Sequence, residues 1–77
     1  MAELLAHEIV GKRIREIRTE KSLTIEALAK KIGISRSYLN YLELGRKNIS
    51  VDKLDVIARC LEVPITDLFK REDQKVE

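Results

Sequence analysis

The stretch Ile25–Leu44, IEALAKKIGISRSYLNYLEL, constrains the fold more than any other part of the chain. Leu28, Ala29 and Ile32 recur at helical spacing and predict one short amphipathic helix. Gly33 follows at the point where the end of a helix favours a residue that tolerates the left-handed conformation. The stretch therefore predicts two short helices joined by a tight turn.

The residues after Gly33 predict how the second helix packs. Ile34 is expected to fill the angle between the two helices, and Ser35 to cap the second helix by accepting a hydrogen bond from a free backbone N–H. Leu39 and Leu42 return that helix to the core. Ala29 is small where two steeply crossing helices must approach closely.

This pattern resembles the helix-turn-helix of lambda-repressor-like, Xre-type DNA-binding proteins. The matching residues, in order, are Ala29, Gly33, Ile34, Leu39 and Leu42. The resemblance extends from about Val10 to Phe69. It implies an all-α fold, a compact bundle of about five short helices, with the helix-turn-helix at helices two and three.

We expect a single helix-turn-helix domain over residues 1–77, with an ordered core at about 9–70 and dimerisation through about 51–70. Residues 1–8 either extend the first helix or fray, and residues 71–77 are expected to fray. Apolar stripes and caps predict the other helices, whose expected bounds are Ile9 or Val10 to about Lys21, about Arg36 to Leu44, a helix capped by Ser50, and Ile65 to about Lys70.

Two connections carry specific expectations. Thr24 is expected to cap the helix that starts at Ile25. The family usually has Gly where Ser22 stands, so the turn there is expected to be slightly strained or differently shaped. The family also often has Gln at the start of helix two, contacting phosphate, and Ile25 stands in its place.

The charges of the chain are unevenly distributed. Residues 11–50 hold ten Lys/Arg and four Asp/Glu, a net charge of +6, whereas the remainder holds five and nine, a net charge of −4, which together give the overall +2. The basic part surrounds the motif and suggests a polyanion partner. A solvated surface is the alternative.

The predicted recognition helix presents polar side chains on its outer face. Arg36 lies at its N-terminal end, where such a helix reads base edges in the major groove, and its planar fork matches guanine O6 and N7. The candidate base contacts are Arg36, Ser37, Asn40 and Tyr41. The candidate contacts to the DNA backbone are Thr24, Ser35, Tyr38, Arg46, Lys47 and Asn48. A plain surface charge remains the alternative for Arg36, and partial burial the alternative for Tyr38 and Tyr41.

Two further sets of residues have expected structural roles. Glu43 faces inward, which is costly for a lone carboxylate, and the resemblance implies that Arg18 pairs with it. The alternative is two exposed side chains that do not meet. Ile65, Leu68 and Phe69 are expected to form a dimer interface, and the alternative is that they close the monomer core.

These features favour a sequence-specific regulator that binds double-stranded DNA as a homodimer on a palindromic operator. The stretches SRSYLNYLELGRKNIS and LEVPITDLF are similar to the controller proteins of restriction–modification systems. A phage-type repressor, or an antitoxin that also binds a protein, is the alternative. RNA polymerase is a further candidate partner.

Other classes of function have little support. His7 and Cys60 are the chain's lone histidine and cysteine, so no metal site, cofactor or catalytic pair is expected, and no enzyme. The single cysteine also excludes an internal disulfide and fits a cytoplasmic location. No signal peptide, membrane segment or small-molecule ligand is expected.

Overall fold

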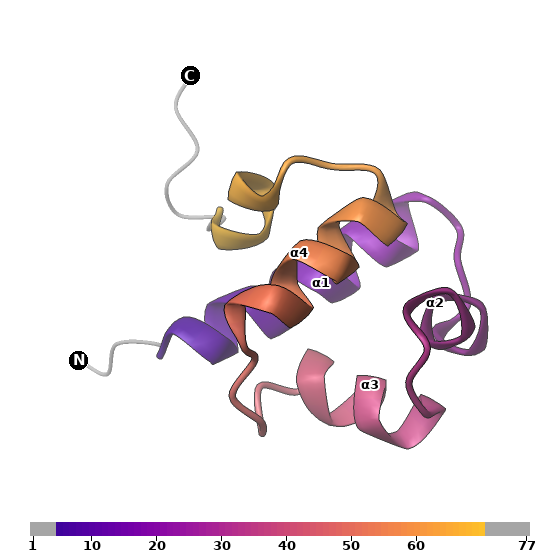
Figure 1. Cartoon of the computed structure of the whole chain (residues 1–77), viewed down its shortest axis with the longest axis horizontal. Helices are drawn as coiled ribbons and strands as arrows, with labels where there is room; N and C mark the ends of the chain where they lie inside the picture. Colours follow the sequence, from indigo (N-terminus) through magenta and orange to yellow (C-terminus); the bar gives the residue numbers. More distant parts are fainter. Residues whose placement is uncertain (1–4, 71–77) are drawn as a thin grey trace.

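The computed structural model describes residues 5–70, and these residues contain helices and no strand. The elements are α1 (Ala6–Glu20), α2 (Ile25–Ile32), α3 (Arg36–Glu43), α4 (Val51–Leu61) and the 3-10 helix η1 (Ile65–Phe69). Figure 1 shows α2 and α3 meeting at a short turn, on the side of the molecule away from η1. The predicted all-α fold with two short helices joined by a tight turn is confirmed, although its last element is a 3-10 helix and not an α-helix.

The first helix begins earlier than its apolar stripe predicts. It starts at Ala6, and the Glu8 carboxylate accepts a hydrogen bond of 2.8 Å from the Leu5 backbone N–H. This bond satisfies one of the donors that lie free at a helix start. The expected fraying of residues 71–77 falls outside the described residues.

The apolar stripes predicted from helical spacing all face one core. The expected residues of α1 and α4 are buried, and so are Leu39 and Leu42 of α3. Leu23 and Ile34 are half-buried under the two connections and pack against the same cluster. The buried apolar residues are Val10, Ile14, Ile17, Leu28, Ala29, Leu39, Leu42, Leu54, Ile57, Ala58, Leu61 and Leu68.

The predicted helix caps are confirmed. The hydroxyl groups of Thr24 and Ser35 accept hydrogen bonds of 3.0 Å from the third residue of α2 and of α3, and Ser50 does the same for α4 at 3.1 Å. Each such cap stabilises the fold by about 1 kcal/mol. Gly33 ends α2 with a φ of +89°, as the turn requires.

The turn after α1 is strained in the way its sequence suggests. Ser22 has a φ of +58°, in the left-handed region that the family's usual glycine occupies without cost. For a residue with a Cβ this conformation costs about 1–2 kcal/mol. Glu62, at the end of α4, adopts the same left-handed conformation, with a φ of +60°.

The expected role of η1 needs a correction. Leu68 is fully buried inside the monomer, and Ile65 is half-buried against the same core. The Arg13 side chain fixes η1 on α1 by donating a hydrogen bond of 2.9 Å to the backbone oxygen of Asp67. Leu68 therefore closes the core, which is the alternative that the sequence left open, and Phe69, 47% exposed, is the outward apolar residue of η1.

Gly11 lets α1 approach the end of α3 at backbone distance, which the sequence pattern did not reveal. A Cβ built on Gly11 would lie 2.1 Å from the backbone oxygen of Leu42 and 3.1 Å from that of Glu43. These neighbours are backbone atoms of α3, which cannot move aside to make room as the end of a flexible side chain can. The contact therefore requires a residue without a side chain at this position.

Replacing Gly11 by alanine is predicted to destabilise the protein. Alanine favours a helix interior by about 1 kcal/mol over glycine, but overpacking a backbone contact costs about 1–3 kcal/mol or more. Thermal unfolding followed by circular dichroism measures the difference. Arg15→Ala, on the exposed side of the same helix, serves as the control. A higher melting temperature for Gly11→Ala than for the wild type would show that α1 and α3 do not touch there.

Candidate nucleic-acid interface

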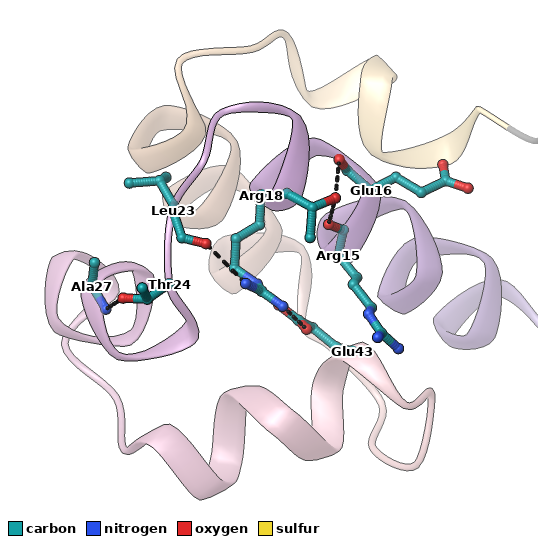
Figure 2. A network of polar contacts seen from close by, with 8 residues as sticks. Arg15, Glu16, Arg18, Leu23, Thr24, Ala27 and Glu43 are labelled. Carbon is teal, nitrogen blue, oxygen red and sulfur yellow. Dashed lines mark hydrogen bonds and ion pairs between the residues drawn. The ribbon is translucent and has the colours of Figure 1, made fainter.

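A buried ion pair holds the inner side of α3 against α1 (Figure 2). The Arg18 guanidinium donates from Nε to Glu43 Oε2 at 2.7 Å and from Nη2 to Glu43 Oε1 at 3.1 Å. Its Nη1 donates to the backbone oxygen of Leu23 at 2.9 Å. One side chain therefore joins α1, α3 and the connection that leads into α2.

Burial makes this pair costly to break. The side chains of Arg18 and Glu43 are 13% and 4% exposed. The hydrogen bond with Glu43 raises the pKa of Arg18 above its ordinary value, more than burial lowers it, and the charges of Glu43 and Glu26 add to the effect. A pair of this kind contributes little beyond a well-packed apolar pair, but removing one partner leaves a buried charge without compensation.

An open depression lies beside α3, between its N-terminal half, α1 and the start of α2. Its volume is about 450 Å³, and its lining is Arg15, Arg18, Ile25, Arg36, Ser37, Asn40, Glu43 and Leu44. Figure 2 shows the side chain of Arg15 extending from α1 toward α3. Three arginines from two helices are thus gathered around one concave, mostly polar surface.

The structure brings together three of the four candidate base contacts. Arg36, Ser37 and Asn40 all line the depression and are exposed. Tyr41 is 45% exposed but is not part of this lining. Tyr38 is half-buried and packs against the core, as the alternative for this residue anticipated.

Arg36 has a partner that the sequence did not reveal. Its Nε lies 3.1 Å from Oε2 of Glu26, which is in the first turn of α2. Both side chains are exposed, at 68% and 61%. The two residues are ten positions apart and lie on different helices, so helical spacing does not predict the pair. They meet because α2 and α3 cross.

The candidate contacts to the DNA backbone lie on the surface. The hydroxyl groups of Thr24 and Ser35 accept the capping bonds, so each still has its own proton to donate to an anion. Arg46, Lys47 and Asn48 are exposed in the loop between α3 and α4. Gly45, with a φ of +73°, turns the chain into this loop.

Two other kinds of feature are absent from residues 5–70. No group of three or more His, Cys, Asp or Glu side chains within this range could hold a metal ion. None of the described helices combines the length and apolar character needed to cross a membrane. Cys60 is half-buried, with Sγ 3.4 Å from the backbone oxygen of Lys31.

A profile of the helix-turn-helix family HTH_3 matches residues 14–68. The chain belongs to this family. It is 41% identical over 64 residues to an uncharacterised HTH-type transcriptional regulator of Archaeoglobus fulgidus, covering 83% of this chain and 91% of that protein. The resemblance to Xre-type proteins drawn from the sequence is thereby confirmed.

Two solved structures extend the comparison. The restriction–modification controller protein C.AhdI from Aeromonas hydrophila has a TM-score of 0.78 and 36% identity, covering 82% of this chain and 96% of that chain. The biofilm regulator SinR in complex with DNA has a TM-score of 0.73 and 32% identity, covering 79% and 98%. The chain spans about half the length of several other curated relatives, from 44% to 56%.

Removing the carboxylate of Glu43 is predicted to destabilise the helix-turn-helix. Glu43→Ala leaves Arg18 charged and largely buried without its partner, a loss of up to about 3–5 kcal/mol. Chemical denaturation monitored by circular dichroism measures the free energy of unfolding. Arg46→Ala, an exposed change close by, should alter it by less than about 0.5 kcal/mol. Equal, small effects of the two substitutions would mean that the pair is solvated and weak.

Proposed function

We propose that this helix-turn-helix protein is a sequence-specific regulator of transcription that binds double-stranded DNA and catalyses no reaction on it. The observation that carries the proposal is the division of α3 into two sides. Leu39 and Leu42 are buried in the core, whereas the polar side chains of Arg36, Ser37 and Asn40 are exposed around an open depression, whose lining also includes the buried Glu43. A rigid helix with exposed polar residues near its N-terminus suits reading of the major groove.

In this proposal the residues of α3 read bases. The terminal nitrogens of Arg36 donate to O6 and N7 of a guanine, which is the commonest specific contact of an arginine. Ser37 and Asn40 pair with neighbouring bases, and Tyr41 reaches a base or a phosphate one turn further on. Exposure of Arg36, Ser37 and Asn40 around a single concave surface supports these roles.

Phosphate contacts on both sides of α3 fix its position in the groove. Their proposed donors are hydroxyl, amide or charged groups, all on exposed residues except Tyr38, which is half-buried. The set is Thr24, Ser35, Tyr38, Arg46, Lys47 and Asn48. Ile25 lines the depression where the family often has a phosphate-binding Gln, so this chain relies on the other members of the set.

We propose that the protein acts as a homodimer on a palindromic operator, because one domain contacts too few base pairs to be selective in a genome. The burial of Leu68 moves the proposed contact to the outward side of α4 and η1. The exposed apolar side chains of α4 and η1 are Val51, Val56 and Phe69, which are 73%, 40% and 47% exposed.

The finer role that we propose is that of a controller protein of a restriction–modification system, which acts on RNA polymerase in the cytoplasm through its operator. The similarity to C.AhdI supports this role because it covers nearly the whole of that chain. The operator should then lie ahead of genes for a methyltransferase or an endonuclease. An operator ahead of a toxin gene or a phage gene would indicate the antitoxin or repressor role instead.

Selection of bound sequences from random duplex DNA, with the purified protein, tests the proposed function. We expect a palindromic motif whose half-sites are centred about one helical turn, roughly 10 base pairs, apart. Recovery of random sequences after several rounds would contradict the proposal.

Arg36→Ala is predicted to weaken binding to the selected duplex by about 1–3 kcal/mol and to relax the preference at one base pair of each half-site. Binding to random duplex should change much less, because it depends on phosphate contacts. Fluorescence anisotropy with duplexes that vary at each position measures both quantities. An equal loss of affinity for selected and random DNA would mean that Arg36 contacts phosphate and does not read a base.

Lys47→Ala is predicted to weaken binding to all duplexes by a similar factor. The slope of log K against log salt concentration should fall in magnitude by about one per subunit, because one phosphate contact is lost. Titrations at several salt concentrations measure this slope, with Lys53→Ala on α4 as the control. An unchanged slope would remove Lys47 from the phosphate contacts.

A further inference from the structure

The ion pair between α2 and α3 has a geometry that bears on how Arg36 reads DNA. Glu26 Oε2 engages Nε of Arg36 at 3.1 Å, so the carboxylate holds the guanidinium by its inner nitrogen. Nη1 and Nη2, the two terminal nitrogens, then form the fork that can meet two acceptors in one plane. Guanine O6 and N7 are such a pair of acceptors.

We propose that Glu26 is a specificity-determining residue, which positions Arg36 to read guanine and keeps it from phosphate. This inference rests on the proposed function, since it assigns a role within the same DNA-reading surface. Glu26 does not itself touch a base. It acts through Arg36, and its effect should appear as discrimination between sequences rather than as affinity alone.

The position of Glu26 gives its charge a second effect. Glu26 pairs with Arg36, which lines the arginine-rich depression, and it also contributes to raising the pKa of Arg18. A phosphate approaching Arg36 from this side meets a like charge, whereas the neutral edge of a base does not. Repulsion of the wrong contact is a common source of specificity.

The pair is expected to orient Arg36 most strongly when DNA is bound. In the free protein both side chains are exposed, so water screens their attraction and the pair adds little to stability. Docking of DNA excludes water from the same place and strengthens the attraction. The orienting effect is therefore largest in the complex, where base reading takes place.

The test compares Glu26→Ala with Glu20→Ala, which removes the same charge from an exposed position at the end of α1. Affinity is measured for the selected duplex, for a duplex changed at the guanine that Arg36 reads, and for random duplex. We expect Glu26→Ala to lower the discrimination at that guanine by about 5- to 10-fold and to tighten binding to random duplex. Glu20→Ala should leave the discrimination unchanged.

Two comparisons separate this inference from the proposed function. Combining Glu26→Ala with Arg36→Ala should reduce discrimination no further than Arg36→Ala alone, because Glu26 acts through Arg36. Wild-type discrimination in Glu26→Ala, together with a clear loss in Arg36→Ala, would overturn the inference and leave the proposed function standing. If Arg36→Ala itself changes no preference, both the reading role of Arg36 and the inference are refuted.

A measurement without DNA gives an independent check. The Nε–H resonance of Arg36 in a nitrogen–proton NMR spectrum should shift in Glu26→Ala and should stay in place in Glu20→Ala. Identical Arg36 resonances in the wild type and in Glu26→Ala would mean that the pair does not form in solution, which would overturn the inference.

Discussion

The buried pair of Arg18 and Glu43 is the interaction on which the rest of the structure depends. The helix that carries the polar surface, α3, has eight residues, and it packs on the core through the buried Leu39 and Leu42 and the half-buried Tyr38. So short a helix offers few apolar contacts to fix its rotation about the core. The bidentate contact with Arg18 fixes it, and the same guanidinium holds the backbone at Leu23 ahead of α2.

This arrangement connects the core to the proposed reading of DNA. With Glu43 turned inward, Arg36, Ser37 and Asn40 line an open surface beside α3. Gly11 allows α1 to approach the carbonyl end of α3, so the helix is held at both its inner side and its C-terminal end. The outer side chains thereby start from defined positions, and less conformational freedom has to be lost when DNA binds.

The parts of the fold that depend on local sequence were predictable, whereas those that depend on the approach of distant segments were not. The apolar stripes of the helices, their N-terminal caps and the turn at Gly33 follow from the spacing of a few neighbouring residues, and the structure confirms them. The burial of Leu68 in the monomer core was not predicted, because helical spacing shows that a residue is apolar and not whether the core or a second subunit covers it. Gly11 and Glu26 were missed because their partners come from other helices.

The central claim is that α3 and the segments beside it form the DNA-binding surface. Titration of the nitrogen-15-labelled protein with the selected duplex, followed by NMR, tests it most directly. The account predicts that the amide resonances of residues 24–26, 35–41 and 46–48 shift most as DNA is added. Binding that leaves the amides of α3 unshifted, with the changes centred on another part of the chain, would contradict it.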